Sequence, residues 1–241
     1  VSEIGNCAFY RCSLSSITIP TSVTSIGEYA FKGCSGFDGT LTIPNSITSI
    51  GNRAFYGCSG FTGELVIPES VTSIGDYAFA NCDNVSSVEI FANVLYLGDY
   101  AFFDCDALES ATVSFGLEYF GALAFGGCEK LSGDGYIPAT VIKLGANPYA
   151  GSGIHRILLD ADSESFQIND KGMLLDISGQ VLYCYPASIQ DEIAVIPESV
   201  TSVVSGAFAG ASMKSIVFPA KFGEVAPYLF MNCDQLETVI I

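Results

Sequence analysis

Cysteine is the residue type with the greatest chemical capacity in this chain, and seven of the nine cysteines fall at one repeated position. They are Cys12, Cys34, Cys58, Cys82, Cys105, Cys128 and Cys233. The first six are single cysteines 22–24 residues apart, without the paired C-x-x-C spacing of a zinc site. If the repeats stack as parallel strands, equivalent Cβ atoms lie about 4.8 Å apart, beyond the ~3.8 Å of a disulfide. The spacing therefore predicts a ladder of buried free thiols, with disulfides between successive repeats as the alternative.

Acid–base catalysis finds few candidates. The single histidine, His155, lies in the strand-like G-I-H-R-I without a partnered Ser or Cys motif, so we expect a surface or edge residue. Pairs of acids could flank a sugar as general acid and nucleophile. These pairs are Asp104 with Asp106 and Asp160 with Asp162. Because 26 acids share 241 residues, solvated loop carboxylates are the favoured interpretation, with weak calcium binding at Asp160, Asp162 and Glu164 as a further alternative. We predict no catalytic residue, no metal site and no cofactor.

A phrase of 22–24 residues recurs along the chain and must position these side chains. Its clearest copies are I-G-E-Y-A-F-K-G-C from Ile26, I-G-N-R-A-F-Y-G-C from Ile50 and I-G-D-Y-A-F-A-N-C from Ile74. The apolar residue that opens each copy, called the anchor below, falls at Ile4, Ile26, Ile50, Ile74, Leu97, Phe120, Leu144, Val203 and Val225. A fixed period in this range is typical of a solenoid, in which each repeat forms one coil. We therefore predict nine coils, with an insertion in the 59-residue interval after Leu144.

Each coil is expected to contain one strand and one short helical turn. Residues 14–19, 40–43 and 65–67 combine β-branched content with near-alternation of apolar side chains, and a proline follows each segment. Stacked once per coil, such strands would form a continuous parallel sheet with one outward face. Ala30 and Cys34 stand four residues apart, which would place both on one face of a helical turn.

The phrase I-G-x-x-A-F-x-x-C-x-x-L-x-x-I-x-I-P-x-x-V-T-S resembles the BspA-like branch of the leucine-rich repeat superfamily. The resemblance covers roughly residues 4–160 and 193–241 and departs from the pattern at 148–149, Val204 and 225–227. It implies an α/β repeat solenoid, a curved array of about nine coils. A parallel β-sheet would form one face, short helical turns the other, and a β-hairpin-like insert would interrupt the array.

The period divides the chain into seven coils in residues 1–160, an insert in 161–192 and two coils in 193–241. In the insert we expect strands at 166–168, 173–175 and 180–185, separated by D-K-G and S-G turns, a phrase that resembles an insert found within arrays of this family. A separate domain is disfavoured because about 30 residues cannot bury a core of their own. The chain opens part-way through one coil and stops on the strand of another, so we expect a piece of a longer protein.

Composition narrows the class of partner. The formal charge of −17 arises from 26 acids and nine bases, and the sequence has no clustered Lys/Arg patch of the kind that nucleic acid or anionic lipid requires. No run approaches the roughly 18 apolar residues of a membrane span, so we expect no direct membrane insertion. The resemblance implies a secreted or cell-surface protein whose signal and anchor lie outside this sequence.

Solenoids bind through their extended sheet face, so the outward strand positions are the candidate binding residues. They begin as Ser and Thr and become varied from Glu64 onward, and varied positions in a regular lattice are the better candidates for recognition. These candidates are Glu64, Val66, Glu89, Phe91, Thr112, Asp134, Tyr136, Arg156 and Leu158. Tyr96 and Tyr119 replace the small Ser of V-T-S in two successive coils, where they could stack on a ligand or on each other.

The resemblance implies a non-enzymatic binding module, engaged in adhesion or in recognition of an extracellular protein or glycan. Two alternatives stay open. The array could be a structural spacer that presents another domain, or, more remotely, a glycan-active enzyme that uses paired carboxylates.

Overall fold

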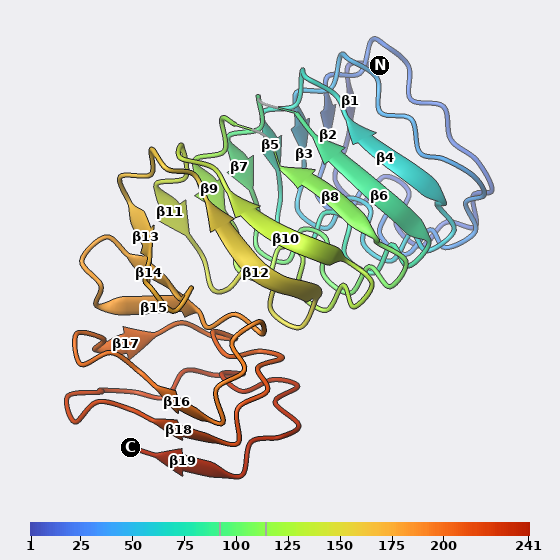
Figure 1. The fold of residues 1–241 in the computed structure, drawn as a ribbon. Coiled ribbons are helices and arrows are strands. Elements are labelled where there is room, and N and C mark those ends of the chain that lie inside the picture. The colour runs from blue at the N-terminus through green and yellow to red at the C-terminus, as the bar shows by residue number, and fades with distance from the viewer. Residues whose placement is uncertain (92, 114) are drawn as a thin grey trace.

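The computed structural model describes residues 1–91, 93–113 and 115–241. They form a solenoid of stacked coils, and every regular element among them is a strand (Figure 1). The anchors lie in seven two-residue strands: β1 (Glu3–Ile4), β2 (Ser25–Ile26), β3 (Ser49–Ile50), β5 (Ser73–Ile74), β7 (Tyr96–Leu97), β9 (Tyr119–Phe120) and β11 (Lys143–Leu144). These pair in parallel, in that order, into one seven-stranded sheet.

Longer strands form a second side of the coils. They are β4 (Gly63–Ile67), β6 (Val85–Ile90), β8 (Ser110–Val113), β10 (Ser132–Ile137) and β12 (Gly153–Leu159), followed near the C-terminus by β16 (Ile193–Val195), β18 (Ser215–Val217) and β19 (Thr238–Ile240). They do not make the continuous sheet that we expected, because β4–β6–β8, β10–β12 and β16–β18–β19 are separate sheets. Their outward side chains together are called the outward sheet face below.

Two of the expected strands are absent from the first coils. Residues 14–19 and 40–43 form no strand, and one isolated parallel bridge joins Gly39 to Phe61. Leu41 and Ile43 are nevertheless buried, each 6% exposed. The alternation of apolar residues therefore indicated correctly which side chains face the core. It did not establish whether the backbone pairs with the next coil, because burial and ladder hydrogen bonding are separate requirements.

The expected short helical turns are wrong, since the described residues contain no helix. In the arm that carries Ala-Phe and Cys, called the turn arm below, alternate amides have different partners. The Lys32 amide donates to Tyr29 within the coil (3.1 Å), whereas the Phe31 amide donates to Ala54 of the next coil (2.8 Å). Tyr29 and Gly33 adopt φ of 57° and 75°, which a right-handed helix excludes. Backbone hydrogen bonds such as that from Phe31 to Ala54 hold the turn arms of adjacent coils at the spacing of paired strands, about 4.8 Å, which is too close for a helix about 10 Å wide.

The interior of the turn arm is a continuous stack of aromatic rings, one per coil, which we call the phenylalanine spine. It consists of Phe9, Phe31, Phe55, Phe79, Phe102, Phe125 and Tyr149. Neighbouring ring centroids lie 5.1–5.7 Å apart with interplanar angles of 6–9°. Each coil therefore buries its ring against both neighbours, which is how a solenoid builds a core from short repeats.

The glycine after the anchor is required by close backbone approach. A Cβ atom at Gly121 would lie 2.2 Å from the carbonyl oxygen of Gly98, and one at Gly51 would lie 2.7 Å from the carbonyl carbon of Gly27. The amides of these glycines donate to the anchor carbonyls of the preceding coil, as Gly51 does to Ile26 at 2.8 Å. Any side chain here would push two coils apart.

The insert forms β13 (Phe166–Ile168), β14 (Leu174–Asp176) and β15 (Val181–Cys184), close to the expected segments. β13, β14 and β15 pair antiparallel in succession, and β15 then pairs in parallel with β17 (Ser202–Val203). Leu182 lies opposite Val203, so it takes the place of an anchor that the sequence pattern missed. The last strand of the insert thus begins a further coil.

The last predicted anchor is wrong. Val225 lies in no strand and is 45% exposed. The flanking A-P of residues 226–227 interrupts the pattern, because proline has no amide to donate to the preceding coil.

The direction of stacking changes at the insert, where β13 and β14 lie between the long array and the C-terminal coils (Figure 1). The core divides within the insert into two clusters. One begins at Ile4 and extends to Leu174 and Cys184, and the other begins at Met173 and Leu175 and extends to Leu229. Asn147, 3% exposed, joins the two parts: its amide nitrogen lies 3.2 Å from the Gly206 oxygen and 3.5 Å from Cys184 Sγ.

Candidate binding surfaces

The predicted binding residues lie in rows across the outward sheet face. Strand register places Val66, Glu89 and Thr112 side by side on β4, β6 and β8. On β10 and β12 it places Asp134 beside Arg156 and Tyr136 beside Leu158. Because the sheets are separate, these residues form two groups and not one continuous row.

Two charges of the second group neutralise each other. Arg156 makes a bidentate ion pair with Asp134, with its Nε 3.0 Å from Oδ1. The hydrogen bond from Arg156 holds the pKa of Asp134 below its ordinary value. Tyr136 donates to Asp160 at 2.7 Å and meets the exposed ring of Phe115 edge-on at 6.2 Å. This group therefore presents an apolar and aromatic surface more than a charged one.

The first group borders a groove of about 620 Å³. It is lined by the unpaired segment 40–43, by Glu64 and Val66 of β4 and by Phe91. The groove opens where 40–43 fails to pair with β4. Its lining mixes hydroxyls and apolar carbon with the carboxylates of Glu64 and Glu69, which disfavours an anionic ligand.

Tyr96 and Tyr119 stack mainly on each other. Their ring centroids lie 4.7 Å apart at an interplanar angle of 11°. The hydroxyls donate to Asp76 at 3.3 Å and to Asp99 at 2.6 Å, and Lys143 Nζ lies 5.2 Å from the Tyr119 centroid. Burial, then the bond to Asp99, raises the pKa of Tyr119. Internal packing accounts for most of this pair, although Tyr96 keeps an exposed edge.

The repeated cysteines have a shared hydrogen-bonding role that the sequence did not reveal. The Sγ of Cys34 donates to the Phe9 carbonyl of the preceding coil at 2.9 Å, and Cys58 does the same to Phe31 at 3.1 Å. All nine cysteines of the chain are thiols in the structure. Burial raises the pKa of Cys82 to about 12 and that of Cys58 still further. These thiols act as small buried donors and are poor nucleophiles.

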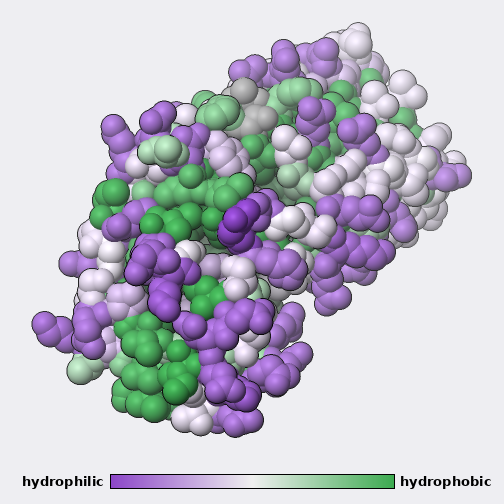
Figure 2. Space-filling view, in the orientation of Figure 1, coloured by the Kyte–Doolittle hydropathy of each residue, from purple (hydrophilic) through white to green (hydrophobic). Residues whose placement is uncertain are grey.

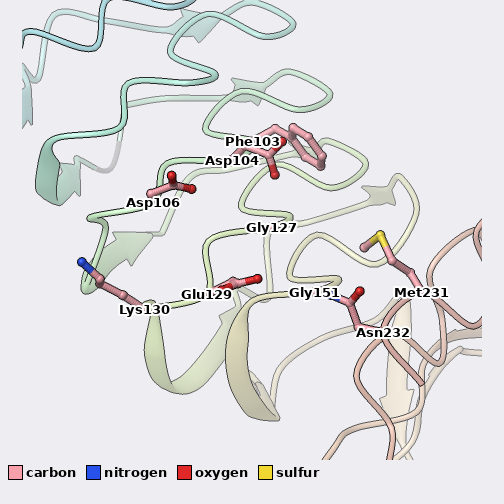
Figure 3. A pocket seen from close by; sticks show the side chains of 9 residues that line it. All are labelled: Phe103, Asp104, Asp106, Gly127, Glu129, Lys130, Gly151, Met231 and Asn232. Atoms are coloured by element: carbon pink, nitrogen blue, oxygen red, sulfur yellow. The ribbon is translucent and has the colours of Figure 1, made fainter. Parts of the chain in front are cut away.

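Two of the candidate catalytic acids line the same hollow. Asp104 and Asp106 line a hollow of about 520 Å³ between the turn arms and the last coil, together with Glu129, Met231 and Asn232 (Figure 3). Burial and then the charge of Asp106 raise the pKa of Asp104. Asp106 itself is exposed on the rim.

The remaining candidates for chemistry, His155 and the pair Asp160 and Asp162, do not line this hollow. His155 is exposed, as expected of a surface or edge residue. It is the extra residue of a β-bulge on β12. Asp160 accepts the hydroxyl of Tyr136 and the amide of Asp162. Within residues 1–91, 93–113 and 115–241, no group of three or more His, Cys, Asp or Glu is arranged to hold a metal ion.

Sequence reasoning missed an apolar region of the outward sheet face near the C-terminus. Register aligns Val195, Val217 and Ile240, with Ile193 one position along β16. Ile193 is 57% and Val195 64% exposed, and Val217 is partly buried. Figure 2 shows hydrophobic residues gathered over this end of the molecule. The signal was present in the sequence, because Ile and Val here replace the Ser and Thr that occupy outward positions in the first coils.

The family model described as the BspA type leucine rich repeat region matches in six copies, over residues 2–132, 39–156 and 182–241. The chain belongs to the BspA-type leucine-rich repeat family. The third matched range begins at Leu182, in agreement with the additional anchor on β15. No curated protein sequence matches the chain significantly.

Solved structures of several other proteins share this fold. A leucine rich cell surface protein from Faecalibacterium prausnitzii is 30% identical, with a TM-score of 0.83 over all of this chain and 65% of that one. The pneumococcal vaccine antigen PcpA is 20% identical, with a TM-score of 0.71 over 95% of this chain and 59% of that one. A leucine rich repeat protein of T. pallidum is 31% identical, with a TM-score of 0.58 over 63% of this chain and 70% of that one.

The chain thus spans about two thirds or less of the length of the first two structures. Leucine-rich repeat families are generally non-enzymatic, and this BspA-type array accordingly presents surfaces for binding or for structural support. In the described part of the chain, no helix is long and apolar enough to cross a membrane.

Proposed function

We propose that this chain is the binding module of a surface-displayed protein and holds an extracellular protein on its outward sheet face. The observation that carries the proposal is the apolar row Val195, Val217 and Ile240 with the neighbouring Ile193. An outward strand position accepts Thr, as the exposed Thr112 of β8 demonstrates, so folding does not require Val or Ile here. Exposed apolar patches of this kind mark protein contact sites.

The relatives support the cellular setting. The F. prausnitzii protein is named as a cell surface protein, and secretion or surface display of this chain is inferred from that likeness. Adhesion to a host or to neighbouring cells is the activity such a module would serve. The Val66 and Leu158 side chains, 39% and 42% exposed, extend the apolar character along the outward sheet face.

The test is binding of the immobilised chain to extracellular-matrix proteins, mucins and glycans at physiological salt. Ile193→Thr/Val195→Thr/Val217→Thr keeps β-branched residues and removes the apolar row. Ile142→Thr/Ile177→Thr, which makes the same kind of change at exposed apolar positions outside the outward sheet face, is the matched control. We expect the triple variant to lose at least about tenfold in affinity for the protein it captures, while the control binds normally.

A second variant, Glu89→Ala/Phe91→Ala/Tyr136→Ala, tests the residues that the sequence nominated. If only this variant loses binding, the contact lies on β6 and β10 and not on the C-terminal row. Binding unaffected by either variant would refute the outward sheet face as the site. If the unmodified chain binds nothing, a spacer that presents another domain becomes the better interpretation, in keeping with its continuous hydrogen-bonded stacking.

A further inference from the structure

A second surface lies on the turn arms of the first coils, away from the outward sheet face. Residues 1–60 contain three bases, Arg11, Lys32 and Arg53, one in each of three successive coils. Tyrosines interleave with them. We call this set the cation–tyrosine strip: Tyr10, Arg11, Tyr29, Lys32, Arg53, Tyr56 and Tyr77.

The rings of adjacent coils hold the cations in place. Lys32 Nζ lies 5.3 Å from the Tyr29 centroid and 4.6 Å from that of Tyr56. The Arg53 guanidinium lies 5.6 Å from Tyr29 and 4.5 Å from Tyr77, and its Nη1 donates to the Tyr29 hydroxyl at 3.1 Å. Tyr29 is thus flanked by both cations. Cation–π contact fixes a charge without neutralising it.

Carboxylates do not neutralise these cations either. In the part of the chain that the structure describes, the ion pairs within 4.0 Å involve Arg156, Lys171 and Lys214. Arg11, Lys32 and Arg53 are in none of them, although the chain carries 26 acids. The strip therefore holds three cations that form no ion pair within the described residues, although the charges of Asp76 and Asp99 reach Tyr77 at its end.

The acids that follow would limit what can bind. Residues 61–130 contain eleven acids and one base, against three of each in residues 1–60. Asp104 and Asp106 lie on the turn side farther along the array, around the hollow of Figure 3. An extended anion that occupies the strip is repelled beyond the fourth coil, which confines it to the first coils.

We propose that the cation–tyrosine strip binds an anionic polysaccharide bearing carboxylate or sulfate groups, laid along the stacking direction. One cation is offered per coil, from a different repeat position in each, so the charges do not follow the regular step of about 6.6 Å between same-side charges of an extended acidic peptide. A sugar residue has a length close to one coil step, and tyrosine hydroxyls and ring edges suit its hydroxyls and C–H groups. The strip is independent of the protein-binding function proposed above.

Binding of four probes by calorimetry tests the proposal: heparin, polygalacturonate, neutral dextran and poly-L-glutamate, each at low and at physiological salt. Lys32→Gln/Arg53→Gln removes the two ring-held cations while keeping side-chain length. Lys171→Gln/Lys214→Gln is the matched control, because it makes the same change in net charge elsewhere. Circular dichroism verifies that both variants are folded.

We expect at least one anionic polysaccharide to bind, with affinity lowered about tenfold or more by Lys32→Gln/Arg53→Gln and less than about threefold by the control. The salt dependence of binding should also become shallower in the first variant. Equal losses in both variants, tighter binding of poly-L-glutamate, or no binding of either polysaccharide at low salt would overturn the proposal. The sheet-face variant with threonine at Ile193, Val195 and Val217 should bind polysaccharide normally, so the two proposals fail separately.

Discussion

Replacing Phe79 by alanine tests whether the phenylalanine spine holds the solenoid together. Phe79 is 1% exposed, and its ring stacks on Phe55 and on Phe102 at 5.2 Å each. Removing a buried phenylalanine costs about 3–5 kcal/mol, and each lost aromatic pair adds about 0.5–1.5 kcal/mol. We expect Phe79→Ala to lower the free energy of unfolding by about 4–6 kcal/mol, allowing for overlap between these contributions.

Phe9→Ala is the matched control at the same repeat position. Phe9 is 37% exposed and stacks on one side, against Phe31 at 5.1 Å, so the expected loss is about 1–2 kcal/mol. Phe79→Leu keeps most of the apolar volume and should lose about 1.5–2.5 kcal/mol, which provides a measurement if the alanine variant does not fold.

Urea unfolding followed by far-ultraviolet circular dichroism measures these losses, and hydrogen exchange locates them. Because each coil contacts mainly its neighbours, protection should fall first in the coils around residue 79. Equal destabilisation by Phe79→Ala and Phe9→Ala would refute the reasoning, since the two residues differ in burial and in the number of stacked partners. A loss below about 2 kcal/mol at Phe79 would do the same.

Three further predictions concern the coil contacts and the buried titrating groups. Gly121→Ala should lower the melting temperature sharply, because its Cβ meets backbone of the preceding coil; a variant as stable as the parent would contradict the close-approach argument. Iodoacetamide at about pH 8 should label exposed Cys7 in the folded chain and leave Cys82 unlabelled, because burial raises the pKa of the Cys82 thiol to about 12. Mass spectrometry distinguishes the two sites, and early labelling of Cys82 would contradict a closed core. The pKa of Tyr96 is raised to about 12, chiefly by burial, and that of Tyr119 is raised as well. The two protonated hydroxyls stabilise the folded state fully below the unfolded pKa of about 10, and this stabilisation is lost as pH rises through the folded pKa values. Tyr96→Phe/Tyr119→Phe should therefore make the decrease in melting temperature between about pH 9 and 12 smaller than in the parent. An unchanged pH profile of the melting temperature would show that these hydroxyls do not contribute.

The sequence predicted the stacking because its period directly reflects burial. Ile26 and Ile50 are 2% exposed and Ile74 is fully buried, as their recurrence before Gly indicated. The helical turn was wrong because i, i+4 spacing alone does not report thickness. The spacing of stacked coils leaves no room for a helix, and Tyr29 at positive φ gives the arm its extended hydrogen bonding to the next coil.

The candidate sites were harder to predict, because the pairing between coils determines which side chains of distant sequence positions lie next to each other. Asp134 and Arg156 are aligned by strand register, but their alignment depends on the bulge at His155, which the sequence pattern did not predict. Leu182 was missed as an anchor because V-L-Y-C-Y lacks both the following Gly and Ala-Phe. The cation–tyrosine strip was invisible for a similar reason: Lys32 and Arg53 are 21 residues apart in sequence and meet only through the ring of Tyr29.

Each ring of the phenylalanine spine meets the next in nearly the same way, with 5.2 Å from Phe31 to Phe55 and 5.2 Å from Phe79 to Phe102. Recombination that adds or removes one coil's worth of codons therefore creates a junction equivalent to the one it replaces. The reach of the array can lengthen or shorten in this way without a compensating substitution inside. The gain or loss of coils is limited around Asn147. A deletion that removed Gly206 or Cys184 would leave the buried side-chain amide of Asn147 without a hydrogen-bond partner. Variation in coil number among related genes should accordingly concentrate on the N-terminal side of Asn147.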